Sequence, residues 1–376
     1  LLRITIDASN LQEGGGIVHL KNLLQISDPR IHGFNKIIVY GGRKPLEQLS
    51  KKDWLDLREI KNLDRSIPDR LMWQKNFLNK NVKQENSLLF IPGGLFLGKS
   101  VKFVTMFQNM QIFETLEKNR EGLSKQWLRL HFLQIAQNQT FRNSAGLICL
   151  SHYALNHLQL FYQKLLNHKE VRIIPHGITK VKKNKKKYRF NERIKLLYVS
   201  TVKQYKHQWH LIDAVALLKQ QGFPLELHLI GSGDGPAIKR MRKAIDDKSS
   251  IGAFTYYHGH LSHSETLDWY NQADLFAYPS SCENLPIILL EAMAAGLPIA
   301  CSDRGPMPEV LKDAGVYFNP ENPSSIAASL KLLLQDESLR ENLGRKALSL
   351  SQAFTWERCA QETFSFLSSV YKHHLI

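Results

Sequence analysis

Cysteine is scarce in this chain of 376 residues, which contains only Cys149, Cys282, Cys301 and Cys359. No two of them have the spacing of a metal or redox motif. An Asp-x-Asp pair, a His-Glu-x-x-His motif and a complete Walker lysine motif are missing as well. We therefore expect free thiols in a reducing compartment, no disulfide, and no metal at the functional site.

Long uninterrupted apolar segments are also missing. The longest apolar run, around Leu285, is broken by Glu291, Gly296 and two prolines. No signal-peptide pattern precedes the first predicted strand, Arg3–Asp7. We therefore expect a protein that neither spans a membrane nor is exported, and that acts in the cytoplasm.

Acidic residues are fewer than basic ones, 34 against 50, which gives a formal net charge of +16. The excess lies in residues 1–178, with 25 basic and 14 acidic side chains, and in residues 179–190, with 7 basic ones; residues 191–376 carry 18 basic and 20 acidic. The first half therefore suits an anionic partner, such as a lipid surface, a diphosphate-linked substrate or nucleic acid, or is simply solubilised by its charge. A nucleic-acid binder would need a recognised module, and none is present.

Basic and aromatic residues are interleaved between positions 65 and 83. The pattern suits a helix that lies on the inner face of an anionic membrane, although a solvated helix is the common alternative. The cations would be Arg65, Arg70, Lys75, Lys80 and Lys83, and the apolar anchors Trp73 and Phe77.

The length and the 43% hydrophobic content predict two domains. Short β-rich runs alternate with helical runs in both halves, which predicts an α/β fold with two doubly wound parallel sheets. We place a first domain at 1–178, a basic linker at 179–190, a second domain at 191–355 and a final helix at 356–376. The predicted strands are Arg3–Asp7, Lys36–Tyr40, Ser87–Ile91, Phe103–Met106, Gly146–Cys149 and Val171–Ile174, then Lys195–Ser200, Leu225–Ile230, Phe254–His258, Leu275–Tyr278 and Ile299–Cys301.

Three loops at predicted strand ends suit ligand contacts, because such loops gather at the carboxyl edge of a doubly wound sheet. The first holds Gly14, Gly15 and Gly16 before a helical run, and the second holds Lys203 and Lys206. The third, Gly231–Gly235, has glycines at 231, 233 and 235 that let backbone approach a ligand or simply turn the chain. An exposed lysine and a plain turn are the alternatives for these loops.

The segment Pro279–Pro298, PSSCENLPIILLEAMAAGLP, places two carboxylates, Glu283 and Glu291, where they are costly. We expect a helix with Asn284 as N-cap, Pro286 in its first turn and a stop at Gly296. Its N-terminus is a candidate anion site. A lone carboxylate on such an apolar helix needs donors, which ligand hydroxyls would supply; a neighbouring backbone group or lysine is the alternative.

This segment resembles the signature of the retaining family 4 glycosyltransferases of the GT-B fold. The matching residues are Pro279, Ser280, Glu283, Pro286, Leu290, Glu291, Ala292, Met293, Ala294, Gly296 and Pro298. The segments Ser302–Gly315 and Val171–Ile178 are also similar to the family. The resemblance implies two Rossmann-like domains that face a central cleft, with the final helix crossing back onto the first domain.

By the same resemblance, Glu291 binds the ribose hydroxyls of a sugar nucleotide and Glu283 lies beside the donor sugar. Lys206 would bind the diphosphate with help from Lys203. The donor would also contact the glycines of the first and third loops and the backbone after Glu283, at Gly15, Gly16, Gly231, Gly233, Asn284, Leu285 and Pro286. Catalysis would involve Glu283 and Lys206.

Two positions depart from the family pattern. Many members have an arginine where this chain has Ser200 and Thr201, which leaves Lys206 with less help. Many also have a histidine where this chain has Gln108 and Asn109. An amide such as Asn109 can position a hydroxyl but takes no proton, which fits a front-face reaction in which the leaving diphosphate accepts the acceptor's proton. The Gln-Asn-Met pattern is similar to bacterial polysaccharide and O-antigen transferases, some of them mannosyltransferases.

The predicted function is therefore retaining, metal-independent transfer of a hexose, with mannose as one candidate, from a GDP- or UDP-sugar. No cofactor is required. The acceptor would be a glycan or a lipid-linked glycan, with peripheral contact to an anionic membrane and no nucleic acid. A nucleotide-sugar epimerase, a transferase for a small soluble acceptor and, more remotely, a basic nucleic-acid-binding protein are the alternatives.

Overall fold

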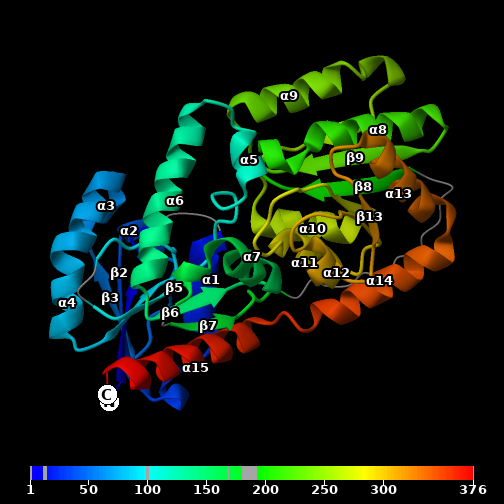
Figure 1. The fold of residues 1–376 in the computed structure, drawn as a ribbon. Coiled ribbons are helices and arrows are strands. Elements are labelled where there is room, and N and C mark those ends of the chain that lie inside the picture. The colour runs from blue at the N-terminus through cyan, green and yellow to red at the C-terminus, as the bar shows by residue number, and fades with distance from the viewer. Residues whose placement is uncertain (1, 12–14, 99–100, 168, 180–192, 376) are drawn as a thin grey trace. The chain divides into compact units, whose positions relative to one another are not determined.

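The computed structural model describes all residues except 1, 12–14, 99–100, 168, 180–192 and 376 (Figure 1). The chain forms two compact units. The first comprises residues 1–113, 123–177 and 354–376, and the second comprises 114–122 and 178–353. The predicted linker lies almost wholly outside the described residues. The excursion of 114–122 into the second unit was not predicted from the sequence, whereas the final helix belongs to the first unit, as the resemblance implied.

The first unit is built on a parallel seven-stranded sheet in the order β3-β2-β1-β4-β5-β6-β7. Every residue of β4, β5 and β6 is buried, as expected for a parallel sheet with both faces covered. Its strands are β1 (Leu2–Asp7), β2 (Phe34–Gly41), β3 (Leu55–Glu59), β4 (Leu88–Ile91), β5 (Phe103–Met106), β6 (Gly146–Cys149) and β7 (Glu170–Ile173).

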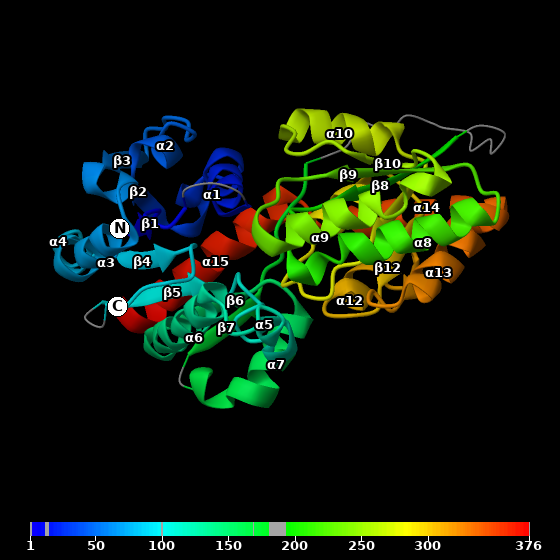
Figure 2. The same ribbon diagram turned by 90° about the horizontal axis from the view of Figure 1, so that it is seen from above.

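Helices pack on this sheet. The last one, α15 (Trp356–Leu375), lies against β4 and α1 (Gly15–Ile26) and buries Phe364 and Leu367 there (Figure 2). The other helices of this unit are α2 (Arg43–Leu46), α3 (Ile67–Trp73), α4 (Asn79–Gln84), α6 (Lys125–Asn143) and α7 (His152–Tyr162).

The second unit is built on a parallel six-stranded sheet in the order β10-β9-β8-β11-β12-β13. Its strands are β8 (Ile194–Val199), β9 (Leu225–Ile230), β10 (Thr255–Tyr257), β11 (Leu275–Tyr278), β12 (Ile299–Ser302) and β13 (Val316–Phe318). Its helices are α5 (Thr115–Asn119), α8 (Gln208–Gln220), α9 (Gly235–Asp246), α10 (His263–Gln272), α11 (Ile287–Ala294), α12 (Met307–Leu311), α13 (Pro323–Gln335) and α14 (Glu337–Ser351).

All eleven predicted strands are present, and the α/β fold with two doubly wound sheets is confirmed. Two strands were missed, β3 and β13, and both lie at a sheet edge. The first alternates apolar with charged residues, and the second has only three residues, so neither shows the apolar run that marks a buried strand.

Strand order reverses between β8 and β11, which are neighbours although far apart in sequence. The loops that follow these two strands therefore leave the same sheet edge side by side, at the place where doubly wound sheets bind ligands. In the first unit the equivalent point lies between β1 and β4. No helix among the described residues is long and apolar enough to cross a membrane.

Candidate functional site

The loop after β8 and the loop after β11 meet through a buried ion pair. The Lys206 ammonium donates to Glu283 Oε1, and both side chains are largely buried, at 7% and 15% exposure. The same oxygen accepts hydrogen bonds from Tyr278 Oη at 2.7 Å and Ser280 Oγ at 2.6 Å. Every hydrogen bond that Glu283 accepts from the described side chains goes to Oε1, so Oε2 remains available to a ligand hydroxyl.

Aromatic rings flank this ion pair. The Lys206 ammonium lies 5.2 Å from the ring centroid of Tyr205 and 5.6 Å from that of Tyr278. Cation–π contacts of this kind attract the ammonium toward the two rings. Burial, and the nearby carboxylate of Glu283, raise the pKa of Tyr278, so its hydroxyl stays protonated and donates.

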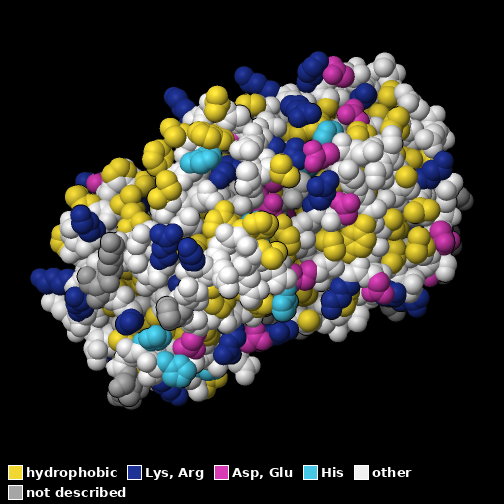
Figure 3. Space-filling view, viewed as in Figure 1, with side chains coloured by type: hydrophobic (Ala, Val, Ile, Leu, Met, Phe, Trp, Pro, Cys, Tyr) yellow, Lys and Arg dark blue, Asp and Glu magenta, His cyan; other side chains and the backbone are white. Residues whose placement is uncertain are grey.

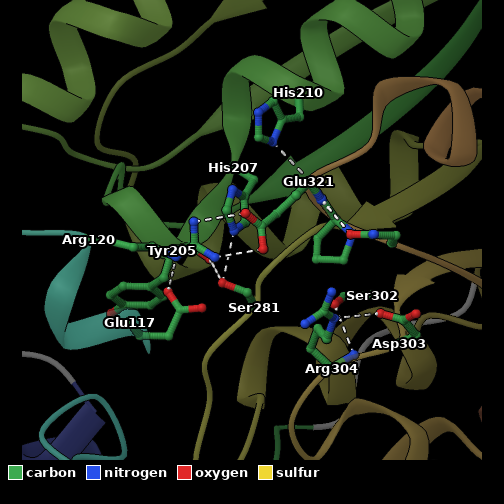
Figure 4. Close-up of polar contacts among 12 residues, drawn as sticks. Glu117, Arg120, Tyr205, His207, His210, Ser281, Ser302, Asp303, Arg304 and Glu321 are labelled. Carbon is green, nitrogen blue, oxygen red and sulfur yellow. Dashed lines mark hydrogen bonds and ion pairs between the residues drawn. The ribbon is translucent and has the colours of Figure 1, made fainter. Parts of the chain in front are cut away.

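Ser281 ties the two loops together. Its backbone N donates to the Tyr205 carbonyl at 2.9 Å, and its hydroxyl bonds His207 Nε2 at 2.9 Å (Figure 4). His207 has a positive φ of 51° just before α8, and burial lowers its pKa to about 3, so it is neutral. These contacts hold the lysine loop in the position that brings Lys206 to Glu283.

The predicted start of the following helix is wrong. Helix α11 begins at Ile287, Pro286 is its N-cap residue, and Asn284 is not the cap. The reason is steric: a residue before proline is biased away from helical geometry, so Leu285 stays outside the helix. Pro286 also has no N–H to offer a ligand. The predicted stop is confirmed, because Gly296 has a φ of 68° and donates to the Met293 carbonyl.

Glu291 lies in the second turn of α11 and is 8% exposed. Its Oε2 accepts a hydrogen bond from Tyr270 Oη at 3.1 Å, and its Oε1 accepts one from His263 Nε2 at 3.1 Å. The His263 side chain is 56% exposed, and its hydrogen bond to Glu291 raises its pKa. Two side chains of α10 therefore supply part of the hydrogen bonding that this buried carboxylate requires. No lysine or backbone group among the described residues takes this role.

At Gly231 and Gly233 of the third loop, a side chain would clash with neighbouring protein atoms. A Cβ at Gly231, where φ is +138°, would lie 2.1 Å from the Ser200 carbonyl oxygen, and one at Gly233 would lie 2.7 Å from Val202 Cβ. A bridge joins Val202 to Gly233. These glycines let the loop after β9 pack against the loop after β8, and this packing alone is enough to require glycine there.

Lys203 forms an ion pair with Asp234, not with Glu283 or Glu291. Its ammonium lies 2.9 Å from Asp234 Oδ1, and both side chains are exposed, at 47% and 84%. An exposed pair of this kind is screened by solvent and contributes little to stability, so Lys203 can exchange Asp234 for another anion.

Residues 114–122 complete this region of the second unit (Figure 4). Arg120 donates from Nη2 and Nη1 to the two carboxylate oxygens of Glu321 at 2.6 and 2.9 Å, and from Nε to Glu117 at 2.6 Å. The guanidinium of Arg120 holds the pKa of Glu321 below its usual value. The segment thereby lies close to His207, whose pKa the same guanidinium helps to lower.

A further cation, Arg304, follows β12 at the same sheet edge. Its Nε lies 3.2 Å from Asp303 Oδ1 (Figure 4). The next residue is Gly305, and a Cβ placed there would lie 3.8 Å from the backbone N of Glu283. The segment that holds Arg304 is therefore adjacent to the loop that holds Glu283.

The remaining predicted residues lie in the first unit. Gly15 and Gly16 open helix α1, while Gly14 is outside the described residues. The exposed Asn109 uses its Oδ1 to accept from the backbone N of Gln111 at 3.2 Å. The Gln108 amide donates to the Pro92 carbonyl at 2.6 Å.

Sequence reasoning missed several residues that hold the candidate site together: Tyr270 and His263 at Glu291, Tyr278 and Ser280 at Glu283, Ser281 with His207, and Arg120 with Glu321. Of these, only Ser280 belongs to the signature. The others are brought in by strand order and by helix α10, and no spacing in the sequence marks them.

Sequence similarity to known proteins is concentrated in the second unit. Residues 180–349 match the family model described as glycosyl transferases group 1. The O-antigen chain mannosyltransferase B of Escherichia coli is 30% identical over 169 residues, which cover 45% of this chain and 44% of that protein. A D-inositol 3-phosphate glycosyltransferase of Paenarthrobacter aurescens is 26% identical over 172 residues, 45% and 42% of the two chains. The chain thus spans less than half the length of these curated relatives.

Similarity in fold extends over nearly the whole chain. Sucrose-phosphate synthase from Thermosynechococcus elongatus superposes with a TM-score of 0.76 at 15% identity, covering 99% of this chain and 100% of that one. HepE from Anabaena, solved in complex with UDP and glucose, gives a TM-score of 0.71 at 17% identity, with 98% and 100% coverage. The chain therefore has the GT-B fold, and residues 180–349 match the model of the group 1 glycosyl transferases.

Proposed function

We propose that this protein is a retaining glycosyltransferase that moves a hexose from a nucleoside diphosphate sugar to an acceptor hydroxyl. The observation that carries the proposal is the buried Lys206–Glu283 pair at the point where strand order reverses in the second sheet. A buried cation beside a carboxylate with one oxygen available suits a substrate that is anionic at one end and a polyol at the other.

In this proposal Lys206 binds the diphosphate and Glu283 Oε2 accepts a hydroxyl of the donor sugar. The pair needs little rearrangement, because an ammonium has three donors and Glu283 uses one of them. Positive charge at Lys206 stabilises the leaving diphosphate most strongly when the glycosidic bond has lengthened.

Glu291 is proposed to bind the ribose. Its carboxylate has four lone-pair sites, and Tyr270 and His263 occupy two of them. Ribose hydroxyls would take the other two or replace the exposed His263. The apolar surroundings of Glu291 strengthen such hydrogen bonds.

Protein groups would neutralise the negative charge of the diphosphate without a divalent cation. Lys206 is assisted by the N-terminus of α8, which begins two residues later, and by Arg304 across the loop. Arg304 would then supply charge that Ser200 and Thr201 do not. Lys203 adds a further cation once Asp234 is displaced.

The reaction that fits these residues is a front-face substitution. The bond from the anomeric carbon to the phosphate oxygen breaks, a bond to the acceptor oxygen forms on the same face, and the departing phosphate oxygen takes the acceptor's proton. Asn109, in the first unit, is proposed to position the acceptor hydroxyl, since a carboxamide donates and accepts hydrogen bonds without changing charge.

The acceptor is proposed to be a glycan, free or attached to a lipid at an anionic membrane. Residues 67–84 form α3, a π-helical turn and α4 in the first unit, and Phe77, Met72 and Ile67 are exposed there at 55%, 57% and 58%. Trp73 was predicted as an anchor, but it is 6% exposed and packs on Tyr40, so that prediction is wrong. Hydrophobic side chains gather over α3 and α6 on one face of the unit (Figure 3).

Three lysines lie in the same helical segment as these exposed apolar residues. Lys75, Lys80 and Lys83 are exposed. Each lysine near an anionic bilayer contributes about 1 kcal/mol to binding. The three cations and three apolar side chains together suit reversible attachment.

A donor panel tests the proposal. The protein is incubated with GDP-mannose, UDP-glucose and related sugar nucleotides, with and without glycan acceptors, and products are identified by mass spectrometry and by the anomeric configuration in NMR spectra. The name of the Escherichia coli relative makes GDP-mannose the first choice, and the UDP complex of HepE makes UDP-glucose the second. Conversion of the donor sugar without release of nucleotide would indicate an epimerase instead, and an inverted product would refute retention.

A further inference from the structure

Three metal-ligating side chains meet inside the first unit. His19 lies on α1, His176 follows β7, and Cys359 lies in the first turn of α15. They are exposed by only 0%, 4% and 2%. One ligand atom of each, an imidazole nitrogen or the sulfur, lies within 4.8 Å of the other two.

The two imidazoles face each other. His19 Nδ1 and His176 Nδ1 are 2.9 Å apart, and the ring centroids are 4.6 Å apart. Two nitrogens at this distance share one proton, so one imidazole directs a lone pair at its neighbour. His19 Nε2 is fully buried and has no hydrogen-bond partner among the residues that the structure describes. A buried polar atom without a partner destabilises the fold unless something binds it.

Aromatic packing and a close backbone contact surround the two histidines. Trp356 packs against both rings, with centroid distances of 5.9 and 6.1 Å. A Cβ at Gly177 would lie 2.2 Å from the backbone N of Trp356, so the chain after β7 directly contacts the start of α15.

We propose that His19, His176 and Cys359 bind a thiophilic metal ion, with Zn²⁺ as the best match. Two imidazoles and a thiolate suit Zn²⁺ and do not suit Mg²⁺ or Ca²⁺, which prefer oxygen ligands. In a tetrahedral site the ligand atoms lie about 3.3 to 3.6 Å apart, which small side-chain rotations can reach from the observed spacing. On binding, the thiol of Cys359 loses its proton to solvent, its sulfur bonds the ion, and each histidine bonds the ion through the lone pair of an unprotonated nitrogen.

Such an ion would join three segments that are distant in sequence. It would fix the end of β7 and the first turn of α15 to α1, whose N-terminus carries Gly15 and Gly16. The ion would be structural, because its three ligands would hold α1, the end of β7 and α15 together. This inference is independent of the glycosyltransferase proposal.

The test uses the full chain after removal of metals with a strong chelator. Titration with Co²⁺ is followed by absorption spectroscopy, because a thiolate ligand gives a charge-transfer band and tetrahedral coordination gives intense visible bands. Zn²⁺ is then titrated by calorimetry and by thermal unfolding, with Mg²⁺ as a control ion. We expect one Co²⁺ or Zn²⁺ per chain, a thiolate band, and a higher melting temperature with Zn²⁺ only.

Variants identify the ligands. Cys359→Ala should lose the thiolate band, and both Cys359→Ala and His176→Ala should bind Zn²⁺ at least 100-fold more weakly. Cys149→Ala is the matched control, since Cys149 is equally buried in the same unit but outside the cluster, and it should behave like the wild type. If Cys359→Ala does not fold, Cys359→Ser is used, with circular dichroism as the folding check. Absence of stoichiometric binding, or a thiolate band that survives in the Cys359 variant, would overturn the proposal.

Discussion

Arg120 and Glu321 are 201 residues apart in sequence and form a bidentate ion pair, with N–O distances of 2.6 and 2.9 Å. The pair belongs to the second unit, although Arg120 comes from the first half of the chain. The parallel geometry of the two hydrogen bonds makes it stronger than an ordinary surface pair. It fastens the segment 114–122 to the loop that precedes α13.

Removal of this pair should loosen the segment 114–122. Glu321→Gln weakens one of the two hydrogen bonds from Arg120 and removes the other, because the amide NH2 cannot accept, at a cost of about 1 to 3 kcal/mol. Amide hydrogen exchange in 114–122 should accelerate about tenfold, while exchange in the sheet of the second unit stays unchanged. Glu341→Gln, at an exposed site on α14, is the control. Equal exchange in both variants would mean that other contacts hold the segment.

Glu291→Gln should weaken binding of the nucleoside diphosphate about ten- to a hundredfold. The reason is that hydrogen bonds to a charged acceptor contribute about 1.5 to 3 kcal/mol each, and the amide removes the charge. Calorimetry with the natural nucleotide and with its 2′,3′-dideoxy analogue measures the effect. The analogue has no ribose hydroxyls at these positions, so the wild type and the variant should bind it equally. A similar loss for both nucleotides would reject the ribose assignment.

Lys206→Ala should reduce turnover about 100-fold and reduce donor affinity much less, because the charge on the leaving diphosphate develops along the reaction. Steady-state kinetics and calorimetry with unreacted donor separate the two effects. Lys206→Met preserves the buried stem and controls for packing. Turnover within twofold of the wild type in either variant would refute the assignment.

Added Mg²⁺ or Mn²⁺ should leave turnover of the wild type unchanged, because the proposed charge compensation comes from Lys206, Arg304 and the N-terminus of α8. Activity is measured in metal-free buffer with each ion added in turn. A strict requirement for either ion would show that the diphosphate is bound through a cation.

His263 should stabilise the fold in a pH-dependent way. Its pKa is raised by Glu291 in the folded protein, so its contribution is complete below the unfolded value of 6.5 and is lost as the pH rises through the folded pKa. The wild type should therefore exceed His263→Gln in stability more at pH 5.5 than at pH 8.5. Because the side chain is more than half exposed, the difference should be at most about 1 kcal/mol and should shrink at high salt. Urea unfolding at both pH values checks the sign.

Much of the fold was predictable because buried parallel strands appear as short apolar runs, and all eleven predicted strands exist. The edge strands β3 and β13 lack that pattern and were missed. The segment 114–122 was assigned to the wrong unit because its docking rests on Arg120 and Glu321, a pair that no local pattern connects.

In the candidate site, too, contacts between residues that are distant in sequence were not predicted. Glu283, Glu291 and Lys206 were singled out because charge is unusual beside apolar runs, and the structure brings Lys206 to Glu283. The partners of Glu291 were not predicted, because Tyr270 and His263 approach from another helix. Trp73 was misplaced because an aromatic residue among lysines fits an interfacial helix and a buried one equally well.

The segments 114–122 and 354–376 make this chain difficult to divide. A gene cut at the linker would produce a first fragment whose sheet lacks the helix that buries Phe364 and Leu367, and a second fragment whose Glu321 has lost Arg120. Chimeras designed to exchange the second unit with that of a relative would inherit both defects if they crossed over only between residues 178 and 193. A workable exchange must transfer 114–122 with the second unit and leave 354–376 with the first, which requires four crossover points in place of one.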